Sequence, residues 1–106
     1  MVEKIDVPTL NTIKKDGSNP IVIDCYADWC MPCKVSSPQF ETLSKRYGNA
    51  RFYKVNVDEQ PKIAMAFKVT GVPSFLILRG KKVVKKVVGA NIPKLEQELK
   101  DELKRY

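Results

Sequence analysis

Two cysteines, Cys30 and Cys33, are the residues whose type and spacing best suit chemistry. A Cys-x-x-Cys pair performs thiol-disulfide exchange in some proteins and supplies half of a zinc site in others. The chain contains no histidine, which excludes cysteine–histidine catalysis and mixed cysteine–histidine zinc sites. A zinc site would need two further ligands, and Cys25 is the only other cysteine. Thiol-disulfide exchange is therefore favoured, and zinc binding is the alternative.

The flanking pattern places this pair where a helix follows a buried strand. Residues 20–27 are a nearly continuous run of β-forming residues between turn residues, which predicts a central strand. Apolar residues then recur at helical spacing from Cys33 to Tyr47, and Gly48 is predicted to end that helix in a left-handed conformation. Cys30 would thus lie where free backbone N–H groups and the helix dipole favour a thiolate.

The same geometry predicts different roles for the two thiols. Cys33 lies one helical turn after Cys30 on the same side, so a Cys30–Cys33 disulfide can close with little backbone movement. We expect Cys30 to be accessible and to attack a substrate disulfide as the nucleophile. We expect Cys33 to be shielded and to act as the resolving thiol, which displaces the reduced product.

The remaining elements predict an α/β fold. Helices are expected at residues 7–14, at residues 61–67 and after Asn91. Strands are expected at residues 51–57, 74–78 and 82–88, the last two joined as a β-hairpin. This order predicts a central mixed β-sheet flanked by helices on both faces.

Length and composition indicate a single domain that spans residues 1–106. Apolar residues make up 43% and charged residues 29%, as in ordinary globular proteins. The first residues lack the features of a secretory signal, and no apolar run is long enough to span a bilayer. We therefore expect a cytoplasmic protein with no membrane contact.

The net charge of +7 is uneven along the chain. From Arg79 onward there are nine Lys and Arg against four Asp and Glu, or +5, which leaves +2 for the first 78 residues. Such a basic end could favour acidic partners or nucleic acid. Lysines in a short hairpin and on a solvated helix face are the commoner cause, and the segment lacks interleaved aromatic and basic residues. We expect no nucleic-acid binding.

The residues around the cysteine pair resemble the thioredoxin family, and the resemblance spans nearly the whole chain. The matching positions are Asp24, Ala27–Cys30, Pro32–Lys34, Pro38, Val57–Asp58, Gly71–Ser74 and Val88–Ala90. The resemblance implies a thioredoxin-like fold and the activity of a thiol-disulfide oxidoreductase.

The resemblance also implies roles for individual residues. Asp24, an acid within an otherwise apolar strand, resembles a buried carboxylate that shuttles a proton to and from Cys33, with Lys54 as its charge partner. Pro73 resembles a proline held in cis opposite the disulfide, where the backbone of Val72 pairs with an incoming peptide. The expected substrate-contact residues are Trp29, Met31, Pro32, Val72, Pro73 and Ala90.

Met31 departs from the family, which usually has glycine at this position. Its flexible apolar side chain would extend the substrate-contact surface or shift the redox potential. Pro32, which is typical of the reducing members, is retained, so the predicted activity is that of a protein-disulfide reductase. Cys25 is expected to be a small buried hydrophobe that points away from Asp24.

The resemblance further implies a monomer with no bound cofactor, recharged by NADPH through thioredoxin reductase. Its substrates would be disulfide-containing proteins of the peroxiredoxin, methionine sulfoxide reductase or ribonucleotide reductase types. The alternative is a protein-binding module or assembly subunit in which redox chemistry is incidental. Such a module would present Trp29, Met31, Val72 and the hairpin Arg79–Lys86 to one partner.

Overall fold

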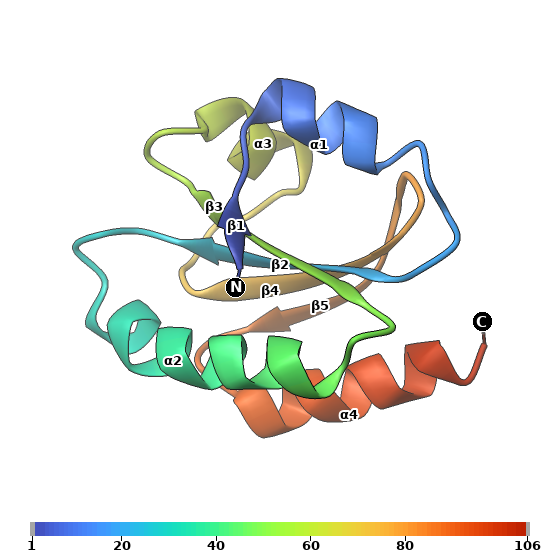
Figure 1. The fold of residues 1–106 in the computed structure, drawn as a ribbon. Coiled ribbons are helices and arrows are strands. Elements are labelled where there is room, and N and C mark those ends of the chain that lie inside the picture. Colours follow the sequence, from blue (N-terminus) through green and yellow to red (C-terminus); the bar gives the residue numbers. More distant parts are fainter. Residues whose placement is uncertain (1, 106) are drawn as a thin grey trace.

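A five-stranded sheet lies between two pairs of helices in the computed structural model, which describes residues 2–105 (Figure 1). The strands are β1 (Glu3–Lys4), β2 (Ile21–Tyr26), β3 (Arg51–Asn56), β4 (Ser74–Arg79) and β5 (Lys82–Val88). The helices are α1 (Val7–Ile13), α2 (Met31–Arg46), α3 (Pro61–Ala66) and α4 (Ile92–Leu103).

The strand order in the sheet is β1-β3-β2-β4-β5. Strand β3 pairs in parallel with β1 and β2, whereas β4 runs antiparallel to both β2 and β5. The predicted mixed sheet with helices on both faces is confirmed. Strand β1 was not predicted, because its two exposed residues carry no periodic pattern and only their register against Tyr53 and Lys54 makes them a strand.

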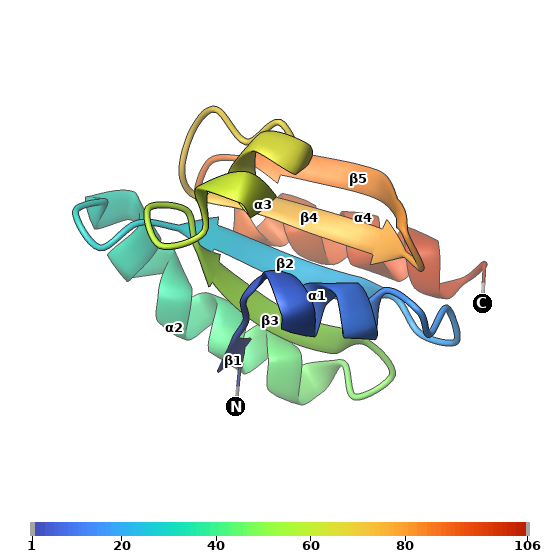
Figure 2. The same ribbon diagram turned by 90° about the horizontal axis from the view of Figure 1, so that it is seen from above.

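The two faces of the sheet carry separate hydrophobic clusters, with α2 and α4 on one face and α1 and α3 on the other (Figures 1 and 2). Alternation along β2 divides its side chains between them: Val22 packs toward α2 and α4, whereas Ile23 and Cys25 pack toward α1 and α3. Asp24 therefore shares the face of Val22 and lies beneath α2.

The cap of α4 agrees with the sequence-based prediction, whereas the conformation of Gly48, which follows α2, does not. The side chains of Asp6 and Asn91 cap α1 and α4 by accepting hydrogen bonds from backbone N–H groups, which is what the predicted start of α4 requires. Helix α2 ends at Arg46, and the prediction that Gly48 adopts a left-handed conformation is wrong. The chain instead leaves the helix through a turn in which the N–H of Ala50 donates to the carbonyl of Tyr47 at 3.2 Å.

Candidate active site

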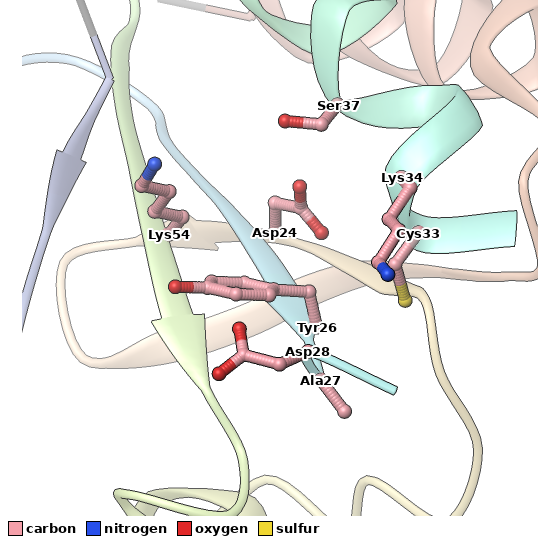
Figure 3. Close-up of a pocket in the computed structure, with 8 residues that line it drawn as sticks. All are labelled: Asp24, Tyr26, Ala27, Asp28, Cys33, Lys34, Ser37 and Lys54. Carbon is pink, nitrogen blue, oxygen red and sulfur yellow. The ribbon is translucent and has the colours of Figure 1, made fainter. Parts of the chain in front are cut away.

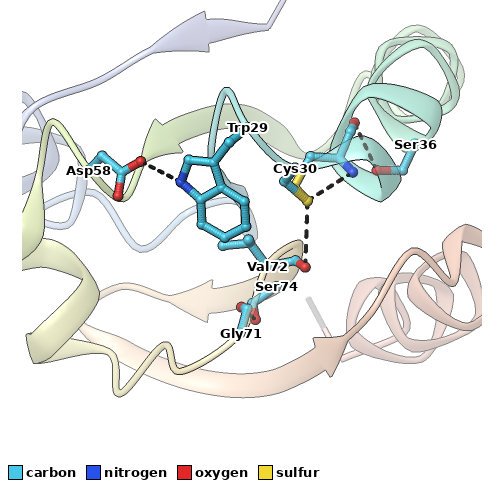
Figure 4. Close-up of a disulfide and its surroundings, with 8 residues drawn as sticks. Trp29, Cys30, Ser36, Asp58, Gly71, Val72 and Ser74 are labelled. Atoms are coloured by element: carbon cyan, nitrogen blue, oxygen red, sulfur yellow. Dashed lines mark hydrogen bonds between the residues drawn. A yellow bond between two sulfur atoms is a disulfide. The ribbon is translucent and has the colours of Figure 1, made fainter.

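Cys30 and Cys33 form a disulfide at the N-terminal end of α2, with their Cα atoms 5.3 Å apart (Figure 4). Helix α2 begins at Met31, two residues earlier than predicted, and Cys30 is its capping residue. The backbone N–H of Cys33 donates a hydrogen bond to Sγ of Cys30 at 3.2 Å. Pro32, in the first turn of the helix, lacks an N–H that would have no helical partner there. The start of α2 therefore places Sγ of Cys30 next to a backbone N–H donor, as expected for an attacking thiolate.

The two cysteines do not differ in exposure. Cys30 is 4% exposed and Cys33 is 3% exposed, so the expected shielding of Cys33 is confirmed, whereas the prediction that Cys30 is accessible is wrong for the disulfide form. The carbonyl oxygen of Val72 lies 3.6 Å from Sγ of Cys30 and covers it from one side. The exposed groups are instead the neighbours Trp29 and Met31, at 69% and 66%.

Trp29 lies beside the loop that carries Val72, and its indole N–H donates to Oδ2 of Asp58 at 2.8 Å (Figure 4). A small hollow of about 130 Å³ separates this indole from the segment Val69–Val72, with Val57 completing its wall. No role was predicted for Asp58, although an acid directly after the predicted strand at residues 51–57 is well placed to bind an indole beside the site. The hydrogen bond keeps a large exposed ring in a defined position.

The opposite rim is formed by the segment around Pro73. The Val72–Pro73 peptide bond is cis, as the resemblance implied. The N–H of Gly89 donates to the carbonyl of Pro73 at 2.9 Å, which brings Ala90 to this rim. Pro32, Met31 and Ala90 are exposed, whereas Pro73 itself is buried. Pro73 thus holds Val72 in place but offers little surface of its own.

A cavity of about 320 Å³ lies behind Cys33 (Figure 3). Its lining residues are Asp24, Tyr26, Ala27, Asp28, Cys33, Lys34, Ser37 and Lys54. Asp24 is 3% exposed, and its carboxyl Oδ1 has no hydrogen-bond partner among residues 2–105. Burial raises the pKa of Asp24 to about 7, and the positive charge of Lys54 offsets part of this effect.

Lys54 is directly opposite Asp24 in the paired strands β2 and β3. Its ammonium group lies 6.0 Å from the ring centroid of Tyr26 and forms no ion pair with Asp24 in the described part of the chain. Lys54 therefore acts on Asp24 through the electric field of its charge and not through direct contact. Without an ion pair, the carboxyl is not held in its ionised form.

Cys25 is fully buried on the other face of β2. Burial, together with the nearby charge of Asp24, raises the pKa of its thiol to about 12. This agrees with the expected small buried hydrophobe. Within residues 2–105, no group of three or more Cys, Asp, Glu or His side chains is arranged to hold a metal ion, and no helix is long and apolar enough to cross a membrane.

The sequence matches the family model named Thioredoxin over residues 3–104. The chain belongs to the thioredoxin family. It is 41% identical over 102 residues to Thioredoxin Asp f 29 of Aspergillus fumigatus, and the match covers 93% of each protein.

Solved thioredoxins have the same fold. The oxidised form of mitochondrial thioredoxin 3 from Saccharomyces cerevisiae superimposes with a TM-score of 0.88 at 36% identity, over 94% of each chain. A similar chain, with a TM-score of 0.88 at 35% identity over 94% of each chain, was solved in work on the thiol-resolving mechanism of yeast mitochondrial 1-Cys peroxiredoxin via glutathione/thioredoxin systems.

Membership of the thioredoxin family, together with the Cys30–Cys33 disulfide, establishes the activity of a thiol-disulfide oxidoreductase. The alternative of a binding module with incidental redox chemistry is not favoured. This thioredoxin fold also brings the cysteine pair against Val72 and places Cys33 beside the cavity that Asp24 lines.

Proposed function

We propose that this thioredoxin-family chain is a protein-disulfide reductase in which Cys30 attacks and Cys33 resolves. The observation that carries the proposal is the division of the pair between two environments. Sγ of Cys30 lies at the opening of α2 against Val72, whereas Cys33 lines the cavity that contains Asp24.

The first step is attack by the Cys30 thiolate on one sulfur of a substrate disulfide. A bond forms between Sγ of Cys30 and that sulfur, and the substrate S–S bond breaks to release the other sulfur as a thiolate. The N–H of Cys33, which donates to Sγ of Cys30, and the positive end of the α2 dipole favour the thiolate form of Cys30. No acidic residue lies in the first turn of α2 to oppose this effect.

The second step is attack by Cys33 on Sγ of Cys30. The Cys30–substrate bond breaks, the substrate leaves as a second thiolate, and the Cys30–Cys33 disulfide forms. Cys33 must lose a proton for this attack, and Asp24 is the carboxyl that shares its cavity. With a pKa of about 7, Asp24 is able to accept that proton near neutral pH and return it to the departing thiolate. The substrate gains two electrons from the cysteine pair, one proton from Cys33 and a second proton from solvent.

Protein substrates would bind across the exposed apolar rim. Trp29 and Met31 are about two-thirds exposed, and the carbonyl of Val72 faces Sγ of Cys30. Met31, in the Cys-Met-Pro-Cys centre, adds a flexible apolar side chain directly beside the attacking sulfur. We assign to it a wider substrate contact than a glycine would provide.

The reduced form would be regenerated by two electrons from NADPH through thioredoxin reductase, without a cofactor bound to this chain. The similarity to a chain from work on a peroxiredoxin and the thioredoxin system supports peroxiredoxins as substrates. Methionine sulfoxide reductase and ribonucleotide reductase types are further proposed substrates. We place the protein in the cytoplasm as a monomer.

The test is reduction of insulin disulfides with dithiothreitol as the electron donor. The wild type should accelerate the reaction, and Cys30→Ser should reduce it to the uncatalysed rate. In a separate reaction of the reduced protein with insulin and no dithiothreitol, Cys33→Ser should instead accumulate a mixed disulfide between Cys30 and the substrate. Cys25→Ser is the matched control and should keep full activity, because Cys25 is buried on the other face of β2.

Equal activity of the wild type and Cys30→Ser would overturn the proposal, and so would a wild type no faster than dithiothreitol alone. Absence of a trapped mixed disulfide in Cys33→Ser would remove the assignment of Cys33 as the resolving thiol.

A further inference from the structure

The segment that carries Val72 begins where α3 ends. Helix α3 is followed by Phe67 and then by Lys68, whose φ of 56° places a residue other than glycine in the left-handed region. The N–H of Lys68 donates to the carbonyl of Met65 at 3.1 Å, and the N–H of Val69 donates to that of Ala64 at 2.9 Å. This arrangement satisfies two carbonyls near the helix end but leaves those of Phe67 and Lys68 without a helical partner.

Lys86 of the edge strand β5 supplies that partner. Its Nζ donates to the carbonyl of Phe67 at 2.8 Å and to the carbonyl of Lys68 at 3.1 Å. Lys86 pairs with Leu76 in the β4–β5 ladder, so its backbone is held by the sheet. A cation at this end of a helix is also favoured by the helix dipole. Lys86 thus ties the end of α3 to the sheet.

Strand β5 also leads into the anchor at the other end of the segment. The N–H of Gly89, directly after β5, donates to the carbonyl of Pro73 at 2.9 Å. Residues 68–73 are therefore held at both ends by β5 and the residue after it. Between these anchors, the carbonyl of Val72 lies 3.6 Å from Sγ of Cys30. A shift at the Lys86 end would move the backbone that faces the disulfide.

We infer that Lys86 is a positioning residue for protein substrates, which it serves by fixing the backbone of residues 68–73 opposite Cys30. The inference rests on the proposed disulfide-reductase function. A substrate with an extended polypeptide segment needs the Val72 backbone in register with its own, because backbone pairing depends on the direction of each N–H and C=O. A small disulfide without peptide bonds needs only access to Sγ of Cys30.

The test compares two substrates across three variants. Lys86→Met keeps the length of the aliphatic side chain but removes the charge and the donors, whereas Lys86→Arg keeps both. Lys82→Met is the matched control, because Lys82 lies on the same strand and its exposed side chain forms no hydrogen bond or ion pair within residues 2–105. Each reduced protein is assayed with insulin and with hydroxyethyl disulfide, and the exchange of the Val69 amide hydrogen is followed by NMR.

Lys86→Met should raise KM for insulin about fivefold, which corresponds to about 1 kcal/mol, and leave kcat nearly unchanged. Its rate with hydroxyethyl disulfide should equal that of the wild type, which also shows that the variant is folded and that its cysteines work. Exchange of the Val69 amide should become faster. Lys86→Arg and Lys82→Met should both behave as the wild type with insulin.

An unchanged KM for insulin in Lys86→Met would overturn the inference while leaving the reductase function intact. An equal loss of rate with both substrates would also overturn it, because Lys86 would then act on the thiols or on stability. A wild type that reduces neither substrate would instead remove the proposed function on which the inference rests.

Discussion

Asp24 and Glu102 are buried carboxylates in different parts of the molecule, one beneath the N-terminal end of α2 and the other near the C-terminal end of α4. They are exposed by only 3% and 1%. Oε1 of Glu102 accepts a hydrogen bond from Nη2 of Arg79 at 2.6 Å, and Nε of Arg105 lies 3.9 Å from its other oxygen. Asp24 has no such partner, and one of its oxygens accepts no hydrogen bond from residues 2–105.

This difference indicates that Glu102 stabilises the fold, whereas Asp24 takes part in the reaction. Arg79 offsets the cost of burying a charge on Glu102 and ties α4 to the end of β4. No cation within residues 2–105 forms an ion pair with Asp24, so its ionised form is unfavourable and its pKa rises to about 7. Burial without a paired cation destabilises ionised Asp24, and the resulting pKa near neutrality allows Asp24 to exchange a proton with Cys33.

The largest expected effect is on the stability of the oxidised protein with Asp24→Asn. The folded-state pKa of Asp24, about 7, lies above its usual 3.8, so the folded state holds this proton more tightly than the unfolded state. The contribution of Asp24 to stability is therefore highest below pH 3.8, falls as the pH rises toward 7 and is level above that. The total loss is about 4 kcal/mol, which Asp24→Asn avoids.

Urea unfolding of both oxidised proteins should thus show Asp24→Asn more stable by up to about 4 kcal/mol at about pH 8 and nearly equal to the wild type at about pH 4. A difference of the same size at both pH values would contradict the assignment of a raised pKa to Asp24.

A smaller effect of opposite sign is expected when the paired carboxylate loses its cation. Within residues 2–105, Arg79→Met leaves the buried Glu102 charge with Arg105 as its remaining ion-pair partner, and the change should cost about 2 kcal/mol at neutral pH. This is less than a fully buried pair would lose, because the Arg79 side chain is 39% exposed. Unfolding in urea measures the loss, with exposed Lys104→Met as the control. Insulin reduction should be unchanged, and a loss of activity would erase the distinction between the two carboxylates.

The smallest effect is expected at Lys54, whose charge lowers the pKa of Asp24 against the larger effect of burial. Lys54→Met should raise that pKa above 7 and extend the pH range over which stability falls. The additional loss at high pH should be at most about 1 kcal/mol, because the two groups form no ion pair. Exposed Lys62→Met is the control. An unchanged pH dependence would show that Lys54 has no influence on Asp24.

Most of the site follows from local sequence patterns, and the exceptions depend on tertiary packing. The run Ile21–Tyr26 identifies a buried strand, and an acid inside it identifies Asp24 as unusual. The equal burial of Cys30 and Cys33 does not follow from helix geometry, because it depends on Val72, which lies about forty residues later and is brought there by the sheet.

Glu102 and Lys86 illustrate the same limit. Glu102 lies beside Leu103 at the edge of the apolar stripe of α4, which is a signal for burial, but its partner Arg79 is set by where β4 ends. Lys86 is one of several lysines in a basic hairpin, and only the position of α3 against β5 distinguishes it from the others. Side chains that act across elements in this way cannot be identified from periodicity alone.

The most direct test of the role of Asp24 is a stopped-flow measurement of the two exchange steps between pH 5 and 9, a range of about two units on either side of its pKa. Reduced protein mixed with a symmetric chromogenic disulfide releases one thiol when Cys30 attacks and a second when Cys33 resolves. For the wild type and Glu102→Gln, the second phase should accelerate with a midpoint near pH 7. For Asp24→Asn it should be about tenfold slower or more and lack that midpoint. A second phase in Asp24→Asn with the rate and pH dependence of the wild type would contradict the role of Asp24 as the proton acceptor for Cys33.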